Sequence, residues 1–278
     1  QPCYVTNTDV LEGTCRGYAS LALLRVPTMI ETSAKTYSRA VGIFLILSIA
    51  GGWFGEMYVP SLIMTGDAAT TAAQLRLNDG LFRLGFAAYL VEAFSDIVLA
   101  WLFYVLLKPV HRDLALLSAF FGLVSMSLFA VTKMFYFAGP MFLKESGYLT
   151  AFTPDQLESL ASFFLSLYAG LSGLSMLFYG TAWILRGYLT YRSGYLPRLL
   201  GVLMVAAGLG FVVKNITQVL APAYSWDLLL APMFLNAVAL TFWMLTRGVD
   251  PDKWDRAFAK RDRSAGAAEA RSLQEPAI

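Results

Sequence analysis

Three charged residues stand inside long apolar stretches of the 278-residue chain, where an unpaired charge is costly. Glu56, Glu92 and Lys214 each lie 16 or 17 residues from a basic residue at the inner end of their stretch. At about 1.5 Å per helical residue, this spacing places all three at one level, roughly 25 Å along the helix. Two carboxylates beside one ammonium could hold a polar ligand or carry a proton, and we expect Glu92 to be the proton carrier.

The candidate pocket includes polar neighbours of these three residues. Asn215 follows Lys214 directly, and Asp96 and Asn236 fall nearer the middle of their stretches. Glu92 and Asp96 are four residues apart, so they share one face of a helix. Such a pair could relay protons, although each carboxylate could equally accept a hydrogen bond from a neighbouring helix. The candidate ligand-binding residues are therefore Glu56, Glu92, Asp96, Lys214, Asn215 and Asn236.

Two further basic residues, Arg83 and Lys133, fall at or near the outer ends of apolar stretches. Long basic side chains at that depth commonly extend their charge to the membrane interface. We therefore expect Arg83 and Lys133 at the outer interface rather than in contact with a ligand.

The trio of charges has three interpretations. Glu56, Glu92 and Lys214 could form interhelical pairs that fix the bundle without any ligand. They could instead line an outward-facing pocket for a small molecule or a lipid headgroup. They could also remain unpaired and extend outward. A dry bundle with every charge paired favours the first interpretation, and a cavity open to water or lipid favours the second.

Few residues are available for other catalytic chemistry. The chain has one histidine, His111, and two cysteines, Cys3 and Cys15, all outside the apolar stretches. A multi-histidine metal site and a bis-histidine haem are excluded. No nucleophile–base set is present in the stretches, so an intramembrane enzyme is the weakest alternative. We expect neither a metal nor a cofactor.

The elements that position these residues follow from composition. Apolar residues make up 57% of the chain and charged residues 14%, against about 45–50% and about 25% in soluble domains. This composition indicates a polytopic membrane protein and excludes a soluble enzyme, a disordered protein and a nucleic-acid-binding domain. Six stretches, the first ending at Pro60, reach the roughly 20 residues that a spanning helix needs: about 40–59, 81–107, 114–138, 157–185, 196–220 and 228–245. The predicted fold is all-α, a bundle of six transmembrane helices.

The chain divides into an arm at residues 1–36, a six-helix domain at residues 37–249 and a charged tail at residues 250–278. Arg25 and Pro27 interrupt the only apolar stretch of the arm. The arm therefore has too few consecutive apolar residues to span a bilayer.

Basic residues are distributed unevenly between the two sides of the predicted bundle. The arm, the second-to-third and fourth-to-fifth loops and the tail carry sixteen Lys and Arg, with Arg186 counted in the fourth-to-fifth loop. The other side carries only Arg76 and Lys144. This bias predicts that the richer side, with both termini, is cytoplasmic. Cys3 and Cys15 would then be reduced thiols.

Local signals mark several helix ends. The sequence TPDQ at 153–156 has the hydroxyl, proline and glutamine of a capping box. Asp67 could cap a short surface helix over 67–77, and Asn78 could cap the second span. Gly194 is expected to end the helix of the fourth span before the fifth begins.

The chain contains several short sequences in a characteristic order: GDAAT at 66–70, GLFRLGF at 80–86, LLKPV at 106–110, and GYL at 187–189 followed by YRSGYLPR at 191–198. In order and spacing they resemble a bacterial multi-pass family described as domain of unknown function 4386 (DUF4386). The resemblance covers roughly residues 37–249. It implies a bacterial inner-membrane protein and supplies no catalytic residues. The third span differs from the family, which often has Arg where this chain has Gly122.

Two classes of function remain. The first is a protein that binds or transports a small molecule or lipid through an outward-facing intramembrane polar pocket. The alternative is a structural or accessory membrane subunit whose buried charges only hold the helices together. The expected partners are membrane lipids and a small-molecule or lipid ligand, with no nucleic acid.

The predicted orientation can be tested by thiol labelling in intact cells, using variants that lack Cys3 and Cys15. Ser146→Cys should react with a membrane-impermeant reagent, because its loop carries few basic residues and should lie outside. Ser193→Cys should not react until the cells are permeabilised. Labelling of Ser193→Cys but not of Ser146→Cys would reverse the orientation.

Overall fold

Helices make up every element of the computed structural model over the residues that it describes, 33–144 and 149–272. Six of these helices are long and apolar enough to cross a membrane: 34–63, 79–107, 112–143, 154–193, 198–220 and 227–246. This confirms the predicted all-α, six-span class. The predictions for Cys3, Cys15 and nearly all of the arm concern residues outside the described ranges.

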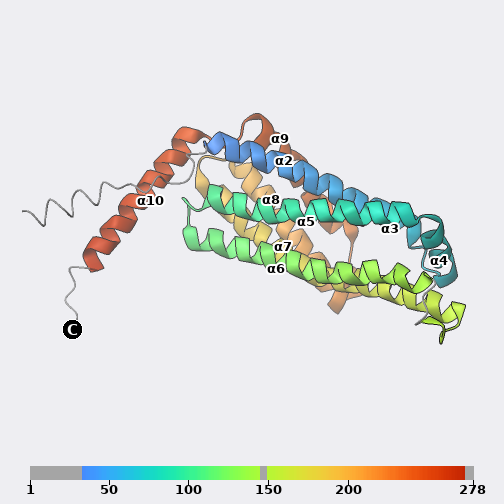
Figure 1. Ribbon diagram of the computed structural model, residues 1–278. Coiled ribbons are helices and arrows are strands. Elements are labelled where there is room, and N and C mark those ends of the chain that lie inside the picture. The colour runs from blue at the N-terminus through green and yellow to red at the C-terminus, as the bar shows by residue number, and fades with distance from the viewer. Residues whose placement is uncertain (1–32, 145–148, 273–278) are drawn as a thin grey trace, which may run out of the picture. The chain divides into compact units, whose positions relative to one another are not determined.

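The six spans run side by side as a bundle (Figure 1). Each packs against the next in sequence and the last packs against the first, so the spans form a closed ring. The first span comprises α2 (Ala34–Gly52), η1 (Trp53–Tyr58) and α3 (Val59–Ile63). The others are built on α5 (Asp79–Leu107), α6 (Arg112–Ala138), α7 (Pro154–Ser193), α8 (Arg198–Leu220) and α9 (Ala231–Thr246). Short turns extend or link them, namely η2 (Gly139–Leu143), η4 (Pro222–Tyr224) and η5 (Asp227–Leu230).

Two further helices identify the ends of the bundle. α4 (Ala68–Leu77) follows the first span and packs against α7 and η2, and we call this the α4 end. α10 (Pro251–Ser272) follows α9, and its Trp254 Nε1 donates to the Leu106 carbonyl at the other end of α5, over 3.1 Å. We call this the α10 end. Tyr195 Oη donates to the same carbonyl over 2.6 Å, so one unpaired carbonyl of α5 joins two later segments.

The short helix over 67–77 is present as α4, and Asp67 caps it as predicted. The Asp67 carboxylate accepts hydrogen bonds from the side chain and backbone of Thr70, which lower the pKa of Asp67 below its ordinary value. Asn78 occupies the N-cap position of α5, as predicted, but its side chain makes no capping hydrogen bond there. Its amide instead donates back to the carbonyl of Gln74, because Asn78 is also the C-cap residue of α4.

The first span does not end at Pro60, as its sequence suggested, but continues to Ile63. Proline has no N–H, so Pro60 cannot bond to the carbonyl of Glu56 four residues earlier. The backbone widens before the proline, and the N–H of Val59 bonds to Phe54 O, five residues back. This π-helical turn contains Glu56, and such turns recur at functional sites.

α7 begins with the predicted capping box, in which the side chains of Thr153 and Gln156 each accept from the other's backbone N–H. It passes its expected end at Leu185 and stops only before Gly194, whose φ is +71°. Arg186 therefore lies within the helix and is only 3% exposed. Its assignment to a loop is wrong, because no residue before Gly194 stops the helix.

Glycines bring the backbones of α7 and α8 close together. A Cβ atom added at Gly187 would lie 2.7 Å from the carbonyl oxygen of Gly201 and 2.7 Å from the backbone N of Val205. A Cβ at Gly180 would lie 2.7 Å from the carbonyl oxygen of Gly208. Small residues at such contacts allow membrane helices to pack at short range.

Gly187→Val should destabilise the fold, because rigid backbone atoms of α8 would have to move away. Overpacking of this kind costs about 1–3 kcal/mol. Gly170→Val is the matched control on α7, since nothing lies within 4 Å of a Cβ at Gly170. Thermal unfolding in detergent micelles measures both variants. Equal melting temperatures for the two would contradict the close α7–α8 contact.

Candidate functional site

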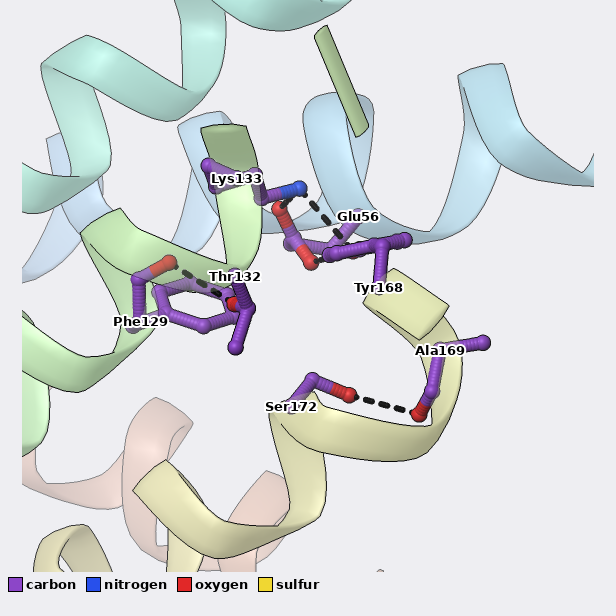
Figure 2. Close-up of polar contacts among 7 residues, drawn as sticks. All are labelled: Glu56, Phe129, Thr132, Lys133, Tyr168, Ala169 and Ser172. Atoms are coloured by element: carbon purple, nitrogen blue, oxygen red, sulfur yellow. Dashed lines mark hydrogen bonds and ion pairs between the residues drawn. The ribbon is translucent and has the colours of Figure 1, made fainter. Parts of the chain in front are cut away.

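The most completely buried lysine of the described chain is Lys133 on α6, at 2% exposure. Its ammonium pairs with the Glu56 carboxylate and lies 2.9 Å from Tyr168 Oη. Tyr168 Oη in turn donates to the other oxygen of Glu56 (Figure 2). We call Lys133, Glu56 and Tyr168 the Lys133 cluster. It joins the first span, α6 and α7 at the α4 side of the bundle.

Aromatic rings complete the surroundings of the Lys133 ammonium. Its Nζ lies 4.2–5.4 Å from the ring centroids of Tyr89, Phe129, Tyr136 and Tyr168. A cation at this distance from a ring face is attracted to it, and more strongly where water is excluded. The charge is therefore held by one carboxylate, one hydroxyl and four rings.

Nearby hydroxyl groups bond within their own helices. Thr132 Oγ1 donates to the carbonyl of Phe129 over 2.8 Å, and Ser172 Oγ donates to that of Ala169 over 3.0 Å (Figure 2). These local bonds satisfy the hydroxyls without a partner from another helix. They leave Glu56 and Tyr168 as the polar partners of Lys133.

Glu92 lies beside the Lys133 cluster but is not part of it. Its Oε2 is buried and has no hydrogen-bond partner among the described residues. Its Oε1 lies against α2, where a Cβ added at Gly52 would come within 2.7 Å of it. Glu92 is within electrostatic reach of Glu56, Asp96 and Lys133. A buried carboxylate oxygen without a donor requires a proton, a water molecule or a ligand.

A second polar group lies further along the same face of α5. Asp96 accepts a hydrogen bond from Ser48 on α2 over 2.8 Å and interacts with Tyr179 and Arg186 of α7. The Arg186 guanidinium packs over aromatic rings, and its Nε has no hydrogen-bond partner in the described part of the chain. A Cβ at Gly122 would lie 2.6 Å from Arg186 Nη2, so the guanidinium would have to shift if this position carried a side chain.

The structure brings together only part of the candidate pocket. Glu56, Glu92 and Asp96 gather where the first span meets α5. Lys214 instead pairs with Asp227, an exposed carboxylate at the start of η5, over 2.7 Å. The physical reason is topological, since α8 packs against α7 and α9 rather than against the first span.

The two asparagines of the candidate pocket also lie apart from the Lys133 cluster. Asn215 is buried and donates to the carbonyl of Phe211 on its own helix over 2.8 Å. Asn236 on α9 is buried, and its Oδ1 has no partner among the residues described. Neither is joined by a hydrogen bond to Glu56 or Glu92 over the described ranges.

Arg83 and Lys133, expected together at the interface, have different environments. Arg83 is exposed and pairs with Asp79 on the same helix over 2.7 Å. Lys133 turns into the bundle, because Glu56 and the rings stabilise its charge there. The positions of two prolines in the sequence indicate that Lys133 and Glu56 lie at similar depths. Lys133 precedes Pro140 by seven residues and Glu56 precedes Pro60 by four, a difference of roughly 5 Å at helical rise.

A groove of about 450 Å³ runs between α5 and α6 on the outer surface of the bundle. Phe94 and Met134, which are 69% and 70% exposed, form part of its rim. Lys133 and Tyr89 contribute to its wall. The groove therefore adjoins the Lys133 cluster from outside, and its lining is otherwise apolar. No group of three or more metal-ligating side chains occurs in the ranges that the structure covers.

Comparison with known proteins gives a family match and a distant relative. Residues 40–248 match the family described as "Domain of unknown function (DUF4386)". A protein of Archaeoglobus fulgidus described as "Uncharacterized protein" is 25% identical over 153 residues, which cover 55% of this chain and 76% of the relative. No solved structure matches the chain.

Lys133→Met should destabilise the protein strongly, because it leaves Glu56 with an unpaired charge in the bundle. Breaking one partner of a buried pair costs about 3–5 kcal/mol, and adding Glu56→Gln should recover part of that loss. Lys214→Met is the control, since its partner Asp227 is 92% exposed and such a pair contributes at most about 1 kcal/mol. Unfolding in mixed micelles provides the measurement. If Lys133→Met costs no more than Lys214→Met, Lys133 is not buried as described.

Proposed function

The chain belongs to the DUF4386 family, and we propose that it binds or transports a small molecule or lipid at an intramembrane polar site formed by the Lys133 cluster and Glu92. One observation carries this proposal. The buried Oε2 of Glu92 has no hydrogen-bond partner among the described residues, although it lies beside the ion pair of Lys133 and Glu56. A bundle held together by polar contacts alone gains nothing from such an oxygen, which costs free energy when left unsatisfied.

The α5–α6 groove supports the same proposal from the outside. Lys133 contributes to the groove wall while its ammonium bonds to Glu56 inside the bundle. The side chains of Lys133 and Tyr89 would therefore lie between a ligand in the groove and the Glu56 carboxylate. Ion pairs between helices of membrane proteins commonly mark substrate or proton pathways. Glu92 would be protonated in the empty site. When a ligand with a hydrogen-bond donor binds, Oε2 would accept from that donor and the proton would be released.

We place this site in the outer part of a bacterial inner membrane, with both termini in the cytoplasm. The support is the distribution of basic residues. Among the described residues, and with Arg186 removed from the count, thirteen Lys and Arg lie on the side of the α10 end and three, Arg76, Arg83 and Lys144, on the side of the α4 end. The positive-inside tendency puts the richer side in the cytoplasm.

A structural or accessory role is the second candidate, and one observation favours it. Lys133 is 2% exposed and has a carboxylate, a hydroxyl and four rings as partners. A charge so completely satisfied can fix three helices without a ligand. Under this role Glu92 would simply be protonated at all times.

The two roles differ in the effect of Glu92→Gln. We expect this variant to keep its melting temperature, because the amide has the shape of a protonated carboxyl. We expect it to lose the molecule that purifies with the wild-type protein, by about tenfold or more, as seen by mass spectrometry of extracts. Asp113→Asn, at an exposed carboxylate of α6, is the control. Equal extracts from wild type and Glu92→Gln, with equal stability, would favour the structural role and contradict the proposal.

A further inference from the structure

The α5–α6 groove continues beyond its apolar part. At the α4 end it meets a second cavity of about 220 Å³, and the two share Phe137 and Met141 in their walls. The second cavity is lined by charged residues at its outer rim, namely Asp79, Arg83 and Lys144. The combined cavity is thus apolar along its length and polar at one end.

The charges at this end favour an anion. Asp79 and Arg83 neutralise each other through their 2.7 Å ion pair. Lys144 is exposed and has no ion pair with any residue in the described ranges. Among the described residues that line the polar end of the groove, one positive charge therefore remains. Arg83 is also 59% exposed in its side chain, so its free N–H groups can still reach a ligand.

The length of the apolar part fits one leaflet of a membrane. It extends along α5 from Phe86 to Ile97, a separation of eleven positions, which is roughly 16 Å at helical rise. Half of a typical hydrocarbon core is about 15 Å. A single acyl chain that lies in the groove would therefore run from the interface to the middle of the bilayer. The volume of about 450 Å³ is also typical of ligand-binding cavities.

We propose that the α5–α6 groove binds an anionic phospholipid of the leaflet at the α4 end, with one acyl chain between α5 and α6 and the phosphate beside Lys144 and Arg83. The ligand is a phospholipid because its phosphate would lie at the depth of the membrane interface while its acyl chain fills the apolar groove. A free phosphate ion has no chain to place there. It does not depend on a ligand at Glu92, whose carboxylate faces α2 rather than the groove. The Lys133 ammonium takes no part, since Glu56 and Tyr168 already hold it.

Native mass spectrometry of the delipidated full chain tests this site. The probes are palmitoyl-oleoyl phosphatidylglycerol and the phosphatidylcholine with the same two chains. The wild-type protein should bind phosphatidylglycerol about tenfold more tightly, because only its headgroup has a net negative charge. Lys144→Glu should remove this preference and leave phosphatidylcholine binding unchanged. Arg112→Glu, at the opposite end of α6, makes the same charge change and should have no effect.

Two tryptophan substitutions test the acyl chain. Ala130→Trp fills the groove from α6 and should weaken binding of both lipids about tenfold, because it occupies the volume of the chain. Its neighbour Val131 is 53% exposed and does not line the groove, so Val131→Trp is the matched control. Ala93→Trp fills the same groove from α5 and provides the test if Ala130→Trp fails to fold.

Three results would overturn the proposal. The first is equal binding of the two lipids by the wild-type protein. The second is unchanged lipid binding in a folded groove-filling variant. The third is loss of phosphatidylglycerol in Glu92→Gln, which would assign the lipid to the polar site inside the bundle. Binding that depends on Lys144 and Ala130 but not on Glu92 would support the groove, whatever the outcome for the polar site.

Discussion

The arrangement at the α4 side of the bundle depends on one constraint, that the ammonium of Lys133 must be neutralised away from water. An isolated charge in a low-dielectric interior costs several kcal/mol, and a close carboxylate offsets that cost only with good geometry and further hydrogen bonds. Glu56 supplies the carboxylate and Tyr168 the hydroxyl. Because these residues come from three separate spans, the first span, α6 and α7 must meet at this point.

Local backbone structure positions the groups that meet this constraint. Glu56 lies in the π-helical turn that precedes Pro60, and that turn allows the first span to continue past a residue with no N–H. Glycines lie against charged groups at two other places in the bundle, Gly52 against Glu92 and Gly122 against Arg186. At Gly122, where the family resemblance leads us to expect arginine, the structure thus places a guanidinium from the neighbouring α7.

The sequence predicted the features that depend on one segment at a time. Six spans followed from length and apolarity, and the caps at Asp67 and Thr153 from residue type and spacing. It did not predict which charges pair, because pairing depends on which helices are neighbours. Lys214 matched Glu56 in depth, yet α8 lies next to α7 and α9, and Lys214 pairs with Asp227 at the start of η5. The continuation of α7 past Leu185 moved Arg186 from a loop into the core.

The central claim is that Lys133 bonds to Glu56 inside the bundle, and solid-state NMR of the protein in lipid bilayers tests it most directly. With ¹⁵N in the lysine Nζ atoms and ¹³C in the glutamate Cδ atoms, dipolar recoupling detects an ammonium in contact with a carboxylate. The account predicts a lysine–glutamate correlation that disappears in Lys133→Met and also in Glu56→Gln. A spectrum in which neither substitution removes any correlation would contradict it.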